Sequence, residues 1–297
     1  MFDVFMRYPG WKPKAVTFSY DDGVHQDRRL IDIFNKYGLK ATFNINGGLT
    51  APEGTVFPKG QIHRRFTKSE IRDLYFSSGH EIACHSLKHK FMDRLSDVGM
   101  ISEIVADRMC LEKLTGRIIR GFAYPYGRYS ERTEAALKAC GILYARTATG
   151  GHSVAVPENL LKINPTCHHS DEMLDYFINK FQTKSPLDES HDRNPWLLYI
   201  WGHAFEFESD NSWDKIEKIA SDISGRDDIW YCTNDEVFGY IHDFRQLVYS
   251  ADGGLVFNPT SRDLYLEAND GKNVCIKPNE TVELSELSIG EFVVTEK

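Results

Sequence analysis

Two adjacent aspartates and a spaced pair of histidines are the residues of this chain best suited to chemistry. Asp21 and Asp22 end the strand-forming segment VTFSYDD, and His85 and His89 are the two ends of the segment HSLKH. Histidines at positions i and i+4 of a helical turn project from one face and can bind one metal ion through both imidazoles. With a carboxylate from a neighbouring strand, they form a ligand set that leaves positions for water and substrate. The pattern therefore predicts a catalytic metal site.

The two aspartates can have different tasks. Successive side chains at a strand end point in opposite directions, so one carboxylate can bind a cation while the other faces its water as a general base. A divalent cation offsets the repulsion between the two charges and lowers the pKa of bound water. The alternatives are structural: the Asp-Asp-Gly segment caps a turn, and the histidine pair lies on a solvated helix.

The elements that must position these residues alternate between strands and helices from about residue 14 to about residue 245. The strand-like runs are KAVTFSY, KATFNIN, GHEIAC, IRGFAY, ILYART, NLLKIN, WLLYIW and DIWYCT. Helical patterns such as QDRRLIDIFNKYG lie between them, and Thr67 with Glu70 has the spacing of a capping box. Strands that are apolar on both faces and alternate with helices indicate parallel βαβ units. We expect an α/β fold, a distorted (β/α)7-8 barrel. A doubly wound open sheet is the alternative, but no glycine-rich dinucleotide motif follows the first strand.

Four of the predicted strands end in residues of unusual chemistry. They end in Asp21-Asp22-Gly23, in HSLKH, in YPYGRYS and in WGH, whose last residue is His203. Ligands of parallel β/α folds bind outside the carboxyl ends of the strands. We therefore expect these four segments to meet at one end of the sheet.

The chain divides into a predicted catalytic domain, residues 1–245, and a small all-β appendage, residues 246–297. The second segment contains Asp-Gly turn signals between short alternating runs.

Composition excludes several classes of partner. The formal net charge is −8 without a basic stripe, so we expect no nucleic-acid partner. No apolar run is long enough to span a membrane, and no signal peptide is visible, so we expect no membrane partner. Six cysteines without paired spacing are typical of reduced thiols. Together these features predict a cytoplasmic protein.

The segments VTFSYDDG, HSLKH, AYPYGRYS and YIWGH, in this order, resemble the motifs of the polysaccharide deacetylases, the NodB-homology enzymes of carbohydrate esterase family 4. The resemblance covers about residues 14–242. It implies a distorted (β/α) barrel, which agrees with the strand count above.

The resemblance also implies roles for individual residues. Asp21 matches the general base, and His203 matches the general acid that protonates the leaving amine. Asp22, His85 and His89 match the ligands of one divalent metal ion, which is most often zinc, with cobalt, nickel or manganese as substitutes. Tyr126 matches the residue whose backbone N–H binds the oxyanion of the tetrahedral intermediate.

Several features of the sequence depart from the family pattern. Ser19 and Tyr20 stand between Phe18 and Asp21, where the family motif has none. Ala123 occupies the position of an arginine that pairs with the base, and Arg146 is the nearest replacement, unless it forms a structural ion pair.

The family's fourth motif, an Asp-Trp pair, has no match in this chain. Trp201 lines the pocket or belongs to the core, and either Glu206 or Asp235 orients His203. His168 and His169 are expected beside a helix N-cap at Ser170 or Asp171, and less expected in the site. These departures indicate a divergent member of the family.

The predicted function is a metal-dependent hydrolase that removes an acyl group, such as acetyl, from an N-acylated amino sugar or a related amide. The expected partner is a small-molecule or oligosaccharide substrate. Two alternatives stay open: a metal-independent amidase or cyclic-amide hydrolase on the same scaffold, and a carbohydrate-binding barrel without turnover.

Overall fold

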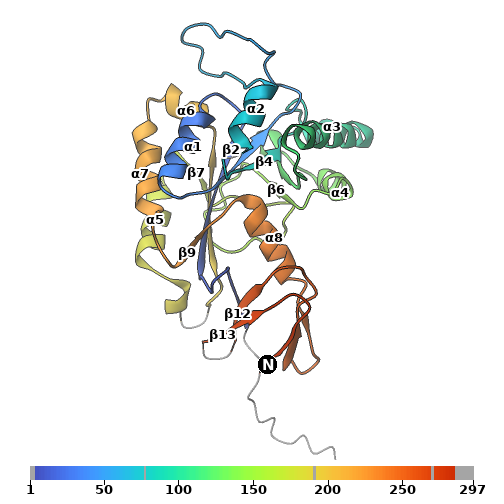
Figure 1. Ribbon diagram of the computed structural model, residues 1–297, viewed down its shortest axis with the longest axis vertical. Helices are drawn as coiled ribbons and strands as arrows, with labels where there is room; N and C mark the ends of the chain where they lie inside the picture. Colours follow the sequence, from blue (N-terminus) through green and yellow to red (C-terminus); the bar gives the residue numbers. More distant parts are fainter. Residues whose placement is uncertain (1–3, 77, 190–191, 269–270, 285–297) are drawn as a thin grey trace, which may run out of the picture.

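The computed structural model describes residues 4–76, 78–189, 192–268 and 271–284, and its centre is a curled parallel sheet (Figure 1). The strands lie in the order β6-β5-β4-β3-β2-β8-β7, and β9 pairs with β2. The outermost strands, β6 and β7, do not pair with each other within the described residues, so the sheet forms a half-barrel. The distorted barrel expected from the sequence is confirmed. The strand bounds are β2 Lys14–Asp21, β3 Ala41–Ile45, β4 Glu81–Cys84, β5 Gly121–Ala123, β6 Tyr144–Arg146, β7 Cys167–His168, β8 Trp196–Gly202 and β9 Ile229–Tyr231.

Strand β2 is the centre of this sheet, and every one of its residues is buried. It pairs with β8 from Lys14 to Tyr20, and it pairs with β9 in its first half and with β3 in its second half. Because both faces and both edges are covered, the apolar run VTFSY needs no polar alternation. The register is unbroken, so Ser19 and Tyr20 are regular strand residues and form no bulge.

Helices cover both sides of the sheet. In Figure 1, α1, α5, α6 and α7 lie on one flank, and α2, α3 and α4 lie on the other. The capping box predicted for Thr67 and Glu70 begins α2. None of the helices in the described ranges is both long and apolar enough to cross a membrane. Their bounds are α1 Asp27–Lys36, α2 Lys68–Tyr75, α3 Asp97–Thr115, α4 Glu131–Ala139, α5 Leu174–Thr183, α6 Ala204–Ser209, α7 Trp213–Ile223 and α8 Asn234–Phe244.

One predicted strand is wrong. The run NLLKIN forms no strand, and only its Ile163 makes a single parallel bridge to Arg146. Pro157 and Pro165 bracket the run and cannot donate to a ladder, and the Asn159 side chain accepts the Leu161 backbone N–H in a turn. The strand that completes the sheet is β7, a few residues further on.

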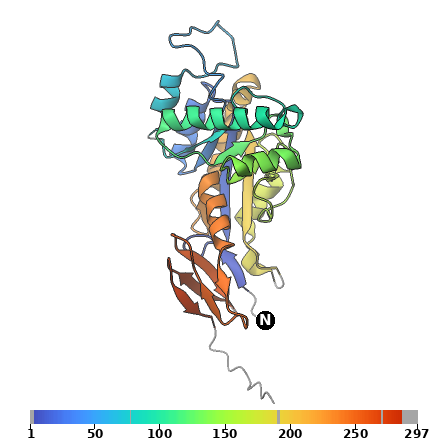
Figure 2. The same ribbon diagram turned by 90° about the vertical axis from the view of Figure 1, so that its right-hand side faces the viewer.

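Two small antiparallel sheets lie at the foot of the molecule, below α8 (Figure 2). One has the order β1-β12-β13 and the other β10-β11-β14. The all-β character expected after residue 245 thus holds up to residue 284, and later residues lie outside the described part. Strand β1 comes from the start of the chain, so this sheet unites both ends of the sequence. The boundary at residue 245 stays a prediction. The strand bounds are β1 Val4–Arg7, β10 Val248–Tyr249, β11 Leu255–Phe257, β12 Leu264–Ala268, β13 Lys272–Ile276 and β14 Thr281–Glu283.

Candidate active site

Asp21 is the last residue of β2, and its buried carboxylate is held by side chains from two other strands. Arg146, at the end of β6, donates from Nη2 to both carboxylate oxygens at 2.5 Å. Asn44 on β3 donates to Oδ1 at 2.8 Å. Ser19 joins the two donors, because its Oγ accepts from Arg146 Nε at 3.2 Å and from Asn44 Nδ2 at 2.7 Å. The structure therefore makes Arg146 a partner of the predicted base. The short side chain of Ala123 cannot make this contact.

These contacts set the ionisation of Asp21. Burial alone would raise the pKa of its carboxyl, but the charges of Arg146 and His85 outweigh burial and lower that pKa below its ordinary value. Asp21 is consequently an anion at neutral pH.

Asp22 has a left-handed backbone, with φ of 87°, which turns its side chain away from the strand direction. Arg65 secures this conformation, because Nη1 donates to the Asp22 carbonyl at 2.6 Å and Nη2 donates to Oδ1 at 2.9 Å. The other oxygen, Oδ2, lies 3.3 Å from His63 Nε2. Burial would raise the pKa of Asp22, but the hydrogen bond to His63 and the charge of Arg65 lower it far below its ordinary value. Arg65 and His63 come from the long connection between β3 and α2.

His85 and His89 converge although they do not lie on a helix. The segment after β4 is an irregular turn in which Ser86 and His89 have φ of 58° and 51°, so the helical turn assumed for HSLKH is wrong. The two Nε2 atoms nevertheless lie 3.1 Å apart. Nδ1 of His85 donates to the Ala123 carbonyl at 2.8 Å, so its Nε2 carries a lone pair.

This arrangement fits a divalent metal ion. One ligand atom each from Asp22, His85 and His89 lies within 4.8 Å of the others. Two imidazoles and one carboxylate form a ligand set that suits zinc and related ions and leaves positions open. The bond from His85 Nδ1 to a backbone carbonyl is the outer contact that metal-bound histidines usually make. Burial and the neighbouring His85 lower the pKa of His89 to about 4, so His89 is neutral and able to bind a cation at pH 7.

A buried acid from α3 holds the turn that carries these histidines. Asp107 accepts the His85 backbone N–H at 3.0 Å and the Gly47 N–H at 2.6 Å. Burial raises the pKa of Asp107 to about 7. Sequence reasoning missed this residue, because an acid inside a helix gives no signal of the two backbone groups that it meets.

His203 directly follows strand β8 and is the N-cap residue of α6. Its Nδ1 lies 3.2 Å from Glu206 Oε1, and its backbone N–H donates to Oε2 at 3.1 Å. Burial would lower the pKa of His203, but the hydrogen bond to Glu206 and the charge of Asp21 raise it above its ordinary value. Of the two acids considered from sequence, Glu206 is therefore the one that contacts His203.

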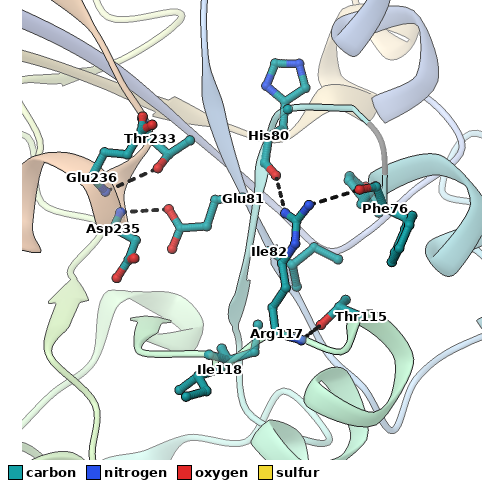
Figure 3. Close-up of a pocket in the computed structure, with 13 residues that line it drawn as sticks. Phe76, His80, Glu81, Ile82, Thr115, Arg117, Ile118, Thr233, Asp235 and Glu236 are labelled. Atoms are coloured by element: carbon teal, nitrogen blue, oxygen red, sulfur yellow. Dashed lines mark hydrogen bonds between the residues drawn. The ribbon is translucent and has the colours of Figure 1, made fainter.

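Asp235 lies elsewhere, beside a pocket of about 200 Å³ at the opposite, amino-terminal end of the strands (Figure 3). Its side chain pairs with Arg120, and its backbone N–H donates to Glu81 at 2.8 Å. Arg117 crosses this pocket and donates to the Phe76 carbonyl at 2.9 Å. Apart from Asp235, none of the site residues considered from the sequence lines it.

Aromatic residues form two walls around the site. The Arg146 guanidinium lies 4.6 Å from the Trp201 ring centroid, so Trp201 is a half-buried cover over the ion pair with Asp21. Tyr126 has φ of 59° and a side chain that is 56% exposed. Its ring stacks on Phe91 and packs against His89 with a centroid distance of 4.5 Å. The predicted oxyanion residue thus lies next to the predicted metal ligands.

His168 and His169 lie in the site and do not flank a helix N-cap. Helix α5 begins only at Leu174, and its N-cap is Met173, so the cap expected at Ser170 or Asp171 is wrong. Both imidazoles instead approach Glu206, with each Nε2 at 3.2 Å from Oε2.

The fold and the site together define a parallel half-barrel protein with a two-histidine, one-aspartate cluster at the carboxyl end of its strands. The family model described as polysaccharide deacetylase matches residues 10–145, which contain Asp21, Asp22, His85 and His89. Over these residues the chain is similar to the polysaccharide deacetylase family.

Individual relatives are distant. A probable peptidoglycan-N-acetylglucosamine deacetylase of Arthroderma benhamiae is 28% identical over 115 residues, which are 38% of this chain. The match spans 23% of that relative's length.

Two solved structures share the fold. A putative polysaccharide deacetylase from Mycobacterium smegmatis has a TM-score of 0.54 at 17% identity, covering 82% of this chain and 94% of the other. A family 4 acetyl xylan esterase from Clostridium thermocellum, in complex with a cobalt ion, has a TM-score of 0.50 at 19% identity, covering 76% and 90%.

Proposed function

We propose that this protein is a metal-dependent hydrolase that removes an acetyl or similar acyl group from an N-acylated amino sugar or a related amide. The observation that carries the proposal is the meeting of Asp21, Asp22, His85, His89 and His203 at one end of the half-barrel. The similarity of residues 10–145 to the polysaccharide deacetylase family model supports the same reaction class.

In this proposal, Asp22, His85 and His89 hold one divalent metal ion, with zinc the first choice. Such an ion would supply Lewis acidity toward the acyl oxygen and lower the pKa of a bound water. The donor set and the lone pair on His85 Nε2 support this assignment.

Asp21 is proposed as the general base. Its carboxylate lies beside the metal ligands, with Oδ2 3.8 Å from His85 Nε2. Arg146 and Asn44 fix both oxygens, so the carboxylate meets an incoming water in one orientation. The low pKa of Asp21 keeps it in the form that accepts a proton.

His203 is proposed as the general acid. Glu206 raises the pKa of His203 and engages Nδ1, which leaves Nε2 to give a proton to the leaving amine. The pKa values of the proposed base and acid are thus pushed in opposite directions, so Asp21 can be deprotonated while His203 holds a proton. The Tyr126 backbone N–H is proposed as the donor to the oxyanion.

An acetate-release assay tests this function. The purified protein would be offered N-acetylated sugars, N-acetylated oligosaccharides and small amides, with and without a chelator. We expect release from at least one N-acetylated sugar, loss of release with chelator and recovery when zinc or cobalt is added back. Release that is indifferent to chelator would favour the metal-independent amidase. The absence of release from every substrate, in protein shown to contain metal, would contradict the proposal.

A further inference from the structure

Glu206 has more polar neighbours than it needs to orient His203. In addition to its two contacts with His203, its Oε2 lies 3.2 Å from Nε2 of His168 and 3.2 Å from Nε2 of His169. His168 ends β7 and His169 follows it, so two adjacent residues of one strand end meet a carboxylate from α6.

The contact of His168 has the character of a hydrogen bond. The Ser170 backbone N–H donates to Nδ1 of His168 at 3.2 Å, so Nδ1 is the acceptor nitrogen of a neutral ring. The ring proton is then on Nε2, which donates to Glu206. The cluster of His168, His169 and Glu206 has a suitable size for a metal ion. A metal ion would need the lone pair on Nε2 of His168, but in this tautomer of His168 Nε2 carries the ring proton.

The ring of His169 is held in place beside Glu206. Its ring is 3% exposed, stacks on Tyr20 and packs against Phe207 with a centroid distance of 4.2 Å. Burial, together with the neighbouring His168, lowers the pKa of His169 to about 3, so the ring is neutral. A Cβ at residue 202 would lie 2.1 Å from Nδ1 of His169, so this close approach requires Gly202. The ring therefore has little freedom to leave Glu206.

From this geometry we infer that His168 and His169 are positioning residues that hold Glu206 against Nδ1 of His203 and so reserve Nε2 of His203 for the substrate. The inference rests on the proposed function, in which His203 is the acid. Without the two imidazoles, the contacts that the Glu206 side chain keeps among the described residues are those to His203, the N-cap of its own helix. Its side chain is already 27% exposed, so it would turn toward solvent.

The charged and titratable groups around His203 come from three elements. Glu206 is on α6, Asp21 and Asp22 lie at the end of β2, and the two imidazoles lie at the end of β7. Only the β7 groups change in the variants below, and the metal ligands stay intact.

The test compares His168→Phe and His169→Phe, which keep the ring shape and remove the N–H donor, with His168→Gln and His169→Gln, which keep a donor. His152→Phe is the matched control, because His152 is an exposed histidine paired with Asp171 away from Glu206. Nitrogen-15 spectra of histidine-labelled protein, at equal metal content, report the tautomer and titration of His203 without any substrate.

In the wild type, we expect neutral His203 to carry its proton on Nδ1. In the two phenylalanine variants, we expect a shift toward the Nε2–H tautomer and a lower titration midpoint. We also expect kcat to fall on the order of tenfold or more with little change in KM. The glutamine variants should restore the wild-type tautomer. Because His168 is the more exposed of the two, its variants still test the inference if those of His169 do not fold.

Two results would overturn the inference. One is an unchanged His203 tautomer in both folded phenylalanine variants. The other is a second metal equivalent in the wild type that the His168→Phe variant loses, which would make the cluster a metal site. If no substrate is hydrolysed, the proposed function fails, but the tautomer measurement still decides this inference.

Discussion

Arg146 and Asp21 stand 125 positions apart in the sequence, yet one guanidinium nitrogen of Arg146 contacts both oxygens of the Asp21 carboxylate at 2.5 Å. Both side chains are almost fully buried. Ala123, at the end of β5, has no side chain that can make this contact. The arginine comes from the next strand, β6, and reaches the same acid from a neighbouring position in the sheet.

Replacement of Arg146 by Met should be severe. It leaves the buried Asp21 without its main counter-charge, so we expect a loss of about 3 kcal/mol in the free energy of unfolding, measured by urea denaturation. Arg132→Met is the control, because Arg132 forms an exposed pair with Asp97 and should cost less than about 1 kcal/mol. Equal stability of both variants would contradict the importance of the buried pair.

The same Arg146→Met variant should change the pH dependence of activity. In the wild type, Arg146 and His85 lower the pKa of Asp21, so the base stays ionised to low pH. Without Arg146, burial raises that pKa, and the base becomes protonated at higher pH. We therefore expect the acid limb of the profile of kcat/KM to move to higher pH. An unmoved acid limb would mean that Asp21 is not the group that titrates there.

Loss of a ligand should remove the metal. Purified wild type should contain about one divalent ion per chain, whereas His85→Ala and Asp22→Ala should contain almost none by elemental analysis. His152→Ala is the matched control and should keep the metal. Full occupancy in both ligand variants would refute the assignment.

Asp21→Asn should separate chemistry from metal binding. Asparagine keeps the size of the side chain and cannot accept a proton, so we expect normal metal content and a fall of kcat on the order of 10² or more. Acetate release and elemental analysis on the same preparation measure the two effects. Wild-type turnover in this variant would eliminate Asp21 as the base.

Asp27 offers a prediction on stability alone. Burial raises the pKa of this carboxyl to about 8, and its Oδ2 accepts from Tyr75 Oη at 2.7 Å and from the Val24 N–H at 3.1 Å. A raised pKa means that the protonated acid stabilises the folded state fully below the unfolded pKa, about pH 4, and that this contribution is lost as the pH rises toward 8.

Asp27→Asn keeps an acceptor oxygen and does not titrate. We expect the variant to be more stable than wild type at pH 8, by an order of a few kcal/mol, and to lose that advantage near pH 4. Asp73→Asn is an exposed control without such an effect. Parallel unfolding curves for wild type and Asp27→Asn across this range would disprove the prediction.

The sequence was sufficient for the parts of the site that local pattern determines. Strand ends fix where Asp21 and His203 lie, because the carboxyl ends of parallel strands share one edge. The convergence of His85 and His89 was expected for the wrong reason, since their spacing suits a helix and the chain forms a turn with two left-handed residues.

Contacts across the sheet could not be predicted from the sequence. The pairing of Arg65 with Asp22 depends on the path of a long connection, and that of Asp107 with His85 depends on how α3 packs. The side chains of His168 and His169 suit a position beside a helix cap as well as a position in the site. The register of β7 beside β8 decides between these two positions, and the sequence does not reveal that register.

The pairing of β1 with β12 has a consequence for the order in which the strands can assemble during folding. Val4–Arg7 pairs with a strand that is made about 260 residues later, and so is Glu267, the counter-ion of Arg7. Until β12 is synthesised, β1 therefore lacks this partner strand and Arg7 lacks this buried acid. Every strand of the half-barrel precedes β12 in the sequence, so the sheet that contains β1 is completed after the strands of the half-barrel have been made.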